Sequence, residues 1–461
     1  MKMMLSIILS NSNLILQASL ALSLSLLLSF VNISSLFLQG LHTYIHPDDV
    51  SPNNTTSQNG VRAAIRRPGA SDSDLKNRKR SKEKFEFDEN KAQIFRLKLN
   101  DNHLQSRLYF NEFRSVFNST IVASSCMLLH KFLSGSKDSG ILANGSLVPI
   151  LLGFAGVCRA FILIVRVSFE RSASKRSEKQ LSVLLGVLGF LLGLTIVFGI
   201  VPPFVIDIEF ESLDGFGRFW VAVFMGCIAG FLFMPAAKSA RAFWLGTDQI
   251  RCNLSIICCG WIGTMLLYAN YLLTVFTSLL WINPLAKLLV NKSIEDTKGS
   301  HLIGRTGDAD ELVGNVGMLQ SDFDKLRLWC LLASGLLQIV TLRLNLQIYL
   351  NEAVLCWYQR LHASKVPDLD FSRAKVFLHN HYLCLAVLQF FVPPALVLLF
   401  LGFSQIDDYL FDNFQVVCTL LPCSAFVKEV ALFVAWWVVF VWSIFTSASL
   451  VLYRRGILYV S

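Results

Sequence analysis

The sequence predicts an all-α fold, a polytopic integral membrane bundle of about nine transmembrane helices. Of its 461 residues, 54% are hydrophobic and only 16% are charged, and the mean hydropathy is +0.53. Soluble domains carry about 25% charged residues, so most of this apolar surface is expected to face a lipid bilayer. The net charge of +9 is typical of basic residues in cytosolic loops, and this reading is favoured over nucleic-acid binding.

Nine segments match the length and composition of a membrane-spanning helix, which needs about 20 predominantly apolar residues. They are residues 5–36, 115–134, 147–168, 181–204, 217–236, 254–282, 326–350, 376–402 and 429–453. The second segment is the least apolar, since Ser124, Ser125 and His130 interrupt it. These nine segments are the predicted transmembrane helices.

Three regions follow: an N-terminal anchor helix (1–38), a polar tract (39–114) and a multi-helix transmembrane domain (115–461). We expect the anchor to be uncleaved, because no short apolar core precedes a cleavage pattern; a signal peptide is the alternative. The tract has few large apolar residues before Phe85, which predicts disorder. Its basic run, residues 76–82, is read as a solvated charge run, with a lipid-headgroup patch or sorting signal as alternatives.

Alternate connections between the predicted helices are basic, and the others are neutral or acidic. This bias predicts a luminal or outside N-terminus and a cytosolic C-terminus, in the plasma membrane or an endomembrane. Asn144 and Asn291 lie in glycosylation sequons on the predicted outside. Of the 11 cysteines, Cys418 and Cys423 share one predicted loop, where they form a disulfide if the loop is luminal, or stay free.

Ionisable and polar residues at membrane depth are costly, so each is a candidate for function. Arg159 and Arg166 are seven residues apart on one helix face, and Arg166, four residues from Glu170, can snorkel to the cytosolic interface. Arg159 lies deeper, and no carboxylate stands at a comparable depth. Two readings stay open for it: binding of an anion or lipid phosphate, and an interhelix hydrogen-bond clamp.

The segment 326–350 carries a polar stripe of Gln338, Arg343, Asn345 and Gln347, which Asn351 and Glu352 continue, and Gln389 stands in the middle of the next segment. Such a stripe should face the bundle interior, either lining a pathway for ions or a polar solute, or joining helices. Pro393 and Pro394 are expected to kink their helix.

Two GxxxG spacings predict close helix packing, by intramolecular contact or by dimerisation. They are Gly189 with Gly193, and Gly226 with Gly230. No nucleotide, metalloprotease or serine hydrolase motif occurs. His379 and His381 do not share a helical face, so a metal site is not expected. We expect no cofactor and no enzymatic activity, and a base role for either histidine is the least favoured reading.

Several separated segments closely resemble the transmembrane protein 161 family, of the A/B type, in collinear order over roughly residues 100 to 400. They include Asp324-Lys325-Leu326-Arg327-Leu328-Trp329, Leu279-Leu280-Trp281-Ile282-Asn283-Pro284 and Gln389-Phe390-Phe391-Val392-Pro393-Pro394. The resemblance implies a multi-spanning protein without an established catalytic activity. Its relatives are linked to tuning of ion currents and to protection against oxidative stress, with no agreed site residues.

Two residues bear on how far that resemblance extends. Gln338 stands where the family pattern tends to have Arg, whereas Arg159 stands where relatives also place a base. The expected function is a non-enzymatic accessory or regulatory protein acting on ion transport or stress signalling, with the bilayer and another membrane protein, such as an ion channel, as partners. The alternative is a channel or transporter lined by Arg159, Gln338, Arg343, Asn345 and Gln389.

Overall fold

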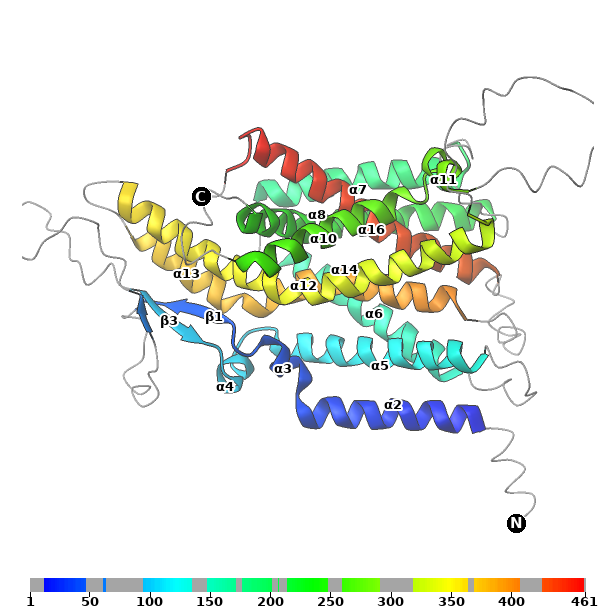
Figure 1. The fold of residues 1–461 in the computed structure, drawn as a ribbon, viewed down its shortest axis with the longest axis horizontal. Helices are drawn as coiled ribbons and strands as arrows, with labels where there is room; N and C mark the ends of the chain where they lie inside the picture. The colour runs from blue at the N-terminus through cyan, green and yellow to red at the C-terminus, as the bar shows by residue number, and fades with distance from the viewer. Residues whose placement is uncertain are drawn as a thin grey trace, which may run out of the picture.

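The structure, a computed structural model, describes residues 12–46, 61–63, 94–134, 147–170, 176–200, 206, 214–247, 259–290, 318–363, 369–406 and 425–459. Its long helices lie side by side in one elongated bundle (Figure 1). Among the described residues, eight helices are long and apolar enough to cross a membrane. They are α2 (Ser12–Val31), α6 (Leu147–Phe169), α7 (Arg176–Val197), α8 (Gly215–Thr247), α10 (Gly260–Leu279), α12 (Gln320–Ala363), α14 (Leu383–Ser404) and α16 (Ala425–Arg454).

The predicted fold class is confirmed: among the described residues, eight of the nine predicted segments lie in helices that are long and apolar enough to cross a membrane. The remaining predicted segment, 115–134, lies within helix α5 (Phe110–Ser134), beside α2 and α6 (Figure 1). Helix α5 is less apolar than the other eight because of its polar side chains. One of these is His130, whose Nδ1 lies 3.3 Å from Gln17 Nε2 of α2. With α5 traversing the bundle, α2 begins and α16 ends at opposite ends of it, as Figure 1 shows.

Within the described residues, the first apolar helix ends earlier than the sequence predicts, because the helix breaks. Helix α2 ends at Val31, Asn32 adopts a left-handed conformation with φ of 50°, and α3 (Ile33–Leu38) continues in a new direction. Asparagine tolerates this conformation better than most residues. The break resolves the excess length, and it leads the chain into the strands that follow.

Part of the tract predicted to be disordered is ordered. Strands β1 (His42–Ile45), β3 (Ile94–Lys98) and β2 (Val61–Ala63) form an antiparallel sheet in the order β1-β3-β2. Helix α4 (Asp101–Gln105) follows, and the basic run 76–82 lies outside the described residues. The composition of the tract did not indicate this sheet, because a sheet that buries only a few side chains needs few large apolar residues. Its Tyr44 and Ile94 pack with Trp357 of α12.

Two helices continue past the predicted ends of their spans. Helix α8 has 33 residues, and α12 has 44, which is about 66 Å at 1.5 Å per residue. Since the hydrocarbon core is about 30 Å thick, the second half of α12 projects from the bundle beside α13 (Asp370–His381), β1 and β3 (Figure 1). At the opposite end, α11 (Asn283–Leu289) caps α10 with Pro284 in its first turn.

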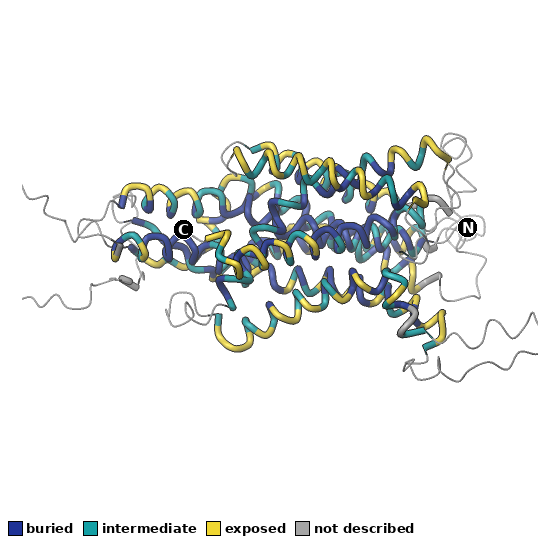
Figure 2. The backbone as a smooth tube through the Cα atoms, turned by 90° about the horizontal axis from the view of Figure 1, so that it is seen from above, coloured by how far each residue is buried: buried dark blue, intermediate teal, exposed yellow. Residues whose placement is uncertain are grey.

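The core of the bundle is built around α14, in which 94% of the residues of the apolar membrane-spanning stretch are buried. Figure 2 shows the buried residues gathered along the axis, with exposed positions on the outer helices. Trp436 and Trp437 of α16 are fully buried, and their indole N–H groups donate to the carbonyls of Ser278 and Met225 at 3.2 and 3.1 Å. Pro393 and Pro394 lie buried inside α14, which runs on to Ser404; the kink stays a prediction.

Helices α7 and α8 pack at backbone distance through glycines. A Cβ atom on Gly226 would lie 2.7 Å from the Phe190 Cβ and 3.0 Å from the Gly186 carbonyl oxygen, and one on Gly189 would clash with Ala229. Gly193 and Gly230 extend the same contact, against Met225 and Gly186. The structure therefore places both GxxxG spacings within one intramolecular interface.

Candidate functional site

A cluster of charged side chains fills the junction of α8, α12 and α13, where α12 leaves the bundle. Glu352 of α12 has a 5% exposed side chain. Its Oε1 lies 3.2 Å from Arg241 Nη1 of α8 and 3.6 Å from Lys375 Nζ of α13. A buried carboxylate is costly unless paired, and here two cations from two other helices compensate one acid. We refer to these three residues as the Glu352 cluster.

Lys238 extends the Glu352 cluster toward the bundle core. It precedes Arg241 by three residues and so shares its face of α8. Its Nζ donates a hydrogen bond of 2.6 Å to Gln389 Oε1 of α14 and lies 5.6 Å from the ring centroid of Tyr349. The amide oxygen and the aromatic face both stabilise a cation, so this lysine ties α8 to α14 and α12.

His379 of α13 closes the site from the projecting side. Its ring stacks on Tyr349 with centroids 4.6 Å apart, and Nδ1 lies 2.9 Å from the carbonyl oxygen of Lys375. Burial is the main cause that lowers the pKa of His379 to about 4, against the opposing charge of Glu352. The imidazole is therefore neutral at pH 7.

We expect this histidine to make stability depend on pH. In the unfolded chain His379 binds a proton near pH 6.5, and in the folded chain only near pH 4. The free energy of unfolding is therefore highest above pH 6.5 and decreases as the pH falls toward 4. Between pH 7 and pH 5 the loss should be about 2 kcal/mol, measured by thermal unfolding in detergent. His379→Phe keeps a stacking ring and should flatten this dependence; an unchanged slope in that variant would contradict the assignment.

The outer face of projecting α12 holds β1. Gln347 brackets His42, accepting from its N–H at 2.9 Å and donating to its carbonyl at 3.2 Å. The Tyr44 hydroxyl donates to Asn351 at 3.2 Å, and Arg343, whose side chain is exposed, donates to the Gln39 carbonyl at 2.8 Å. This half of the polar stripe anchors the N-terminal sheet.

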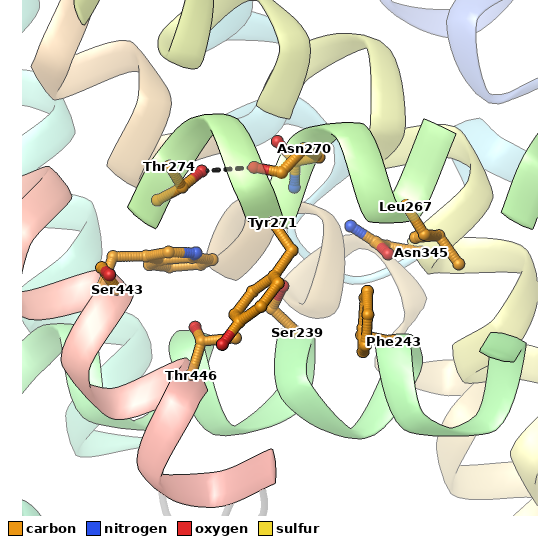
Figure 3. Close-up of a pocket in the computed structure, with 10 residues that line it drawn as sticks. Ser239, Phe243, Leu267, Asn270, Tyr271, Thr274, Asn345, Ser443 and Thr446 are labelled. Carbon is orange, nitrogen blue, oxygen red and sulfur yellow. Dashed lines mark hydrogen bonds between the residues drawn. The ribbon is translucent and has the colours of Figure 1, made fainter. Parts of the chain in front are cut away.

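A small polar cavity lies between α8, α10, α12 and α16 (Figure 3). Ten residues line it: Ser239, Phe243, Leu267, Asn270, Tyr271, Thr274, Asn345, Trp442, Ser443 and Thr446. Its volume is about 20 Å³, room for a single water, which needs roughly 10–15 Å³. Within the described residues, the Oδ1 atoms of Asn270 and Asn345 and the Thr446 hydroxyl have no hydrogen-bond partner, so a water there would satisfy buried groups.

The five residues considered as a pathway lining do not line one cavity in the described part of the chain. Asn345 lines the cavity of Figure 3 without the other four. Gln338 is buried and donates a hydrogen bond to Ser334 at 3.4 Å, and Gln389 accepts a hydrogen bond from Lys238. Arg343 binds the N-terminal backbone, and Arg159 is exposed on α6. Buried and exposed positions are thus mixed within the set.

Arg166 forms an ion pair with a residue of the neighbouring helix α5. Its guanidinium lies 3.6 Å from Glu112 of α5 and over the Tyr109 ring at 5.8 Å. Glu170 instead accepts a hydrogen bond of 2.6 Å from the Tyr109 hydroxyl. Tyr109 thus contacts both Arg166 and Glu170, while the ion pair of Arg166 is with Glu112.

The sequence predicts that Lys238 and Arg241 lie in a connection, because the apolar run ends at residue 236; the structure places both on α8. The signal was present: Ala236-Ala237-Lys238-Ser239-Ala240-Arg241 contains no residue that ends a helix.

Four predicted site residues lie outside the described residues: Asn144, Asn291, Cys418 and Cys423. Within the described ranges, no group of three or more His, Cys, Asp or Glu side chains is placed to hold a metal ion.

Long apolar helices packed around buried α14 define the class: a multi-pass integral membrane protein. Residues 213–405 match the model of a family described as predicted transmembrane protein 161AB. Over these residues the chain matches the transmembrane protein 161A/B family, and the resemblance read from the sequence is confirmed. The matched region contains α8 through α14, and with them the Glu352 cluster, Lys238 and Gln389. No solved structure matches the chain.

Proposed function

We propose that this protein is a non-enzymatic accessory protein that modulates ion transport or stress signalling through its contacts within the membrane. The observation that carries the proposal is how its polar groups are used. The Glu352 cluster, Lys238 and Gln389 are engaged between helices, and the cavity at Asn345 has a volume of about 20 Å³. Such groups hold a bundle together, whereas a conducting pathway needs polar groups facing a continuous space.

The same reasoning supports the absence of catalysis in the proposal. His379 is stacked on Tyr349 and bonded to a backbone carbonyl. The His381 ring lies against Phe377 and Tyr382, with centroids 5.8 and 5.0 Å away. A general base must reach the proton of a substrate, and both rings are instead packed among aromatic side chains.

The orientation in the proposal rests on the charge of the connections, with the N-terminus outside or luminal and the C-terminus cytosolic. The membrane is the plasma membrane or an endomembrane. Sugar on Asn144 or Asn291 would support this orientation. Sugar on Asn53 or Asn54, two further sequons that the proposal places inside, would overturn it or show that the first segment is a cleaved signal. Delivery to the cell surface is verified separately before any electrical recording, because only protein at the cell surface is informative there.

Whole-cell recording in an electrically quiet cell line tests the proposal. The chain alone should give no current above background, whereas its depletion from an excitable cell should change the density of an endogenous current, reversed by re-expression. Asn345→Leu, which fills the cavity, is the matched variant and should restore the current as well as the wild type. A new current in quiet cells whose reversal potential shifts in Asn345→Leu would establish a channel and overturn the accessory role.

A further inference from the structure

Arg159 stands at the centre of a membrane-spanning helix. Helix α6 spans Leu147–Phe169, and at 1.5 Å per residue Arg159 is about 18 Å from its first residue and about 15 Å from its last. The hydrocarbon core is about 30 Å thick, so neither interface is within reach of the side chain. Snorkelling, which serves Arg166 at the end of the same helix, cannot serve Arg159.

The guanidinium of Arg159 faces outward without a partner. Its side chain is exposed, and in the described part of the chain it takes part in no hydrogen bond, ion pair or cation–π contact. Arg166 on the same face has both Glu112 and Tyr109. An arginine at the bilayer centre costs about 2.5–3.5 kcal/mol on insertion scales, and here nothing in the described structure offsets that cost.

The face around Arg159 is otherwise apolar. Leu151, Phe154 and Ile162 are exposed at helical spacing with Arg159, while Ala160 and Ile164 on the opposite face are buried in the core. Lipid chains can cover the apolar side chains but offer no acceptor to a guanidinium, and lipid phosphates lie at the interface. The missing group must therefore be an acceptor held at mid-bilayer by another transmembrane helix.

A second copy of this chain has no free carboxylate at mid-bilayer in its described helices. Apart from Glu352, the acidic residues of the long helices lie within the first five residues, near the interface: Glu112, Glu178, Asp322, Asp324 and Glu429. Glu352 is buried and paired. Charge complementarity thus favours a different protein as the occupant of this face.

We propose that the outer face of α6 binds a transmembrane helix of another protein that places an Asp or Glu carboxylate opposite Arg159 at mid-bilayer. The proposal rests on the accessory function and deepens it, since it names the contact and the chemistry of the partner. Leu151, Phe154 and Ile162 would pack against the partner helix, and the Arg159 guanidinium would donate to its carboxylate.

The test uses the full chain in phosphatidylcholine vesicles and two synthetic leucine-rich transmembrane peptides, with Glu or Leu at the central position. Association is measured by energy transfer between labels on chain and peptide. The Glu peptide should bind the wild type about tenfold more tightly than the Leu peptide, equivalent to about 1.4 kcal/mol. Arg159→Leu should abolish this preference, and Arg159→Lys should keep part of it.

Arg166→Leu is the matched control, because it removes one charge from the same face and should preserve the preference for Glu. Equal binding of both peptides to the wild type, or a preference that survives Arg159→Leu, would refute the proposal. So would a photoreactive residue at position 154 that crosslinks two copies of this chain. A current carried by the chain alone would refute the accessory function while leaving the peptide preference intact, so the two failures are distinguishable.

Discussion

Replacing Glu352 with Gln is expected to lower the free energy of unfolding by about 3–5 kcal/mol, the usual cost of breaking a buried ion pair. The side chain is 5% exposed, with Arg241 at 3.2 Å and Lys375 at 3.6 Å. The substitution keeps the shape but removes the negative charge, so two cations from different helices are left facing a neutral amide. Thermal unfolding of the purified protein in detergent measures the effect.

Asp322→Asn provides the control for the Glu352 substitution. Asp322 pairs with Lys325 at 3.1 Å, but both side chains are more than half exposed, and exposed pairs contribute about 0–1 kcal/mol. Replacing Glu352, Arg241 and Lys375 together by Leu should recover much of the lost stability, because no charge then remains unpaired. If Glu352→Gln lowered the free energy of unfolding as little as Asp322→Asn does, the ion pairs of Glu352 with Arg241 and Lys375 would not be important for stability.

The membrane spans were predictable because the bilayer imposes a length on each apolar run. All nine predicted segments contain a helix, and even the polar 115–134 lies within the continuous α5. Helix ends were less predictable, since a hydropathy window stops at the first charges while the helix does not. At α8 the helix continues to Thr247 because Lys238 and Arg241 find partners on other helices.

For each polar residue, the surroundings of its side chain, buried or exposed, were harder to predict than its position along a membrane-spanning helix. A spacing of seven places Gln338 and Asn345 on one face, and the structure buries both. The same spacing links Arg159 to Arg166, yet both are exposed, because periodicity says which residues share a face and not what covers it. Lys375 and His379 lie on α13, outside the polar stripe of α12, so only the tertiary packing brings them to Glu352.

Gly226→Leu is expected to destabilise the protein by about 3 kcal/mol, the upper end of the usual cost of overpacking. The new Cβ atom would lie 2.7 Å from the Phe190 Cβ and 3.0 Å from the Gly186 carbonyl oxygen. Neither atom is the end of a flexible side chain, so α7 must move away from α8 along its length. Thermal unfolding, together with the yield of monodisperse protein in detergent, measures the loss.

Gly215→Leu is the matched control for Gly226→Leu, because a Cβ atom there has no atom within 4 Å, and it should leave stability nearly unchanged. The pair also decides between the two roles of the GxxxG spacings. If the glycines seat α7 on α8, Gly226→Leu lowers stability whatever the protein concentration. If they served dimerisation, the same variant would leave the unfolding of the monomer unchanged and only shift the oligomeric state. The close approach of Gly186 to both Gly226 and Gly230 within one chain favours the first outcome.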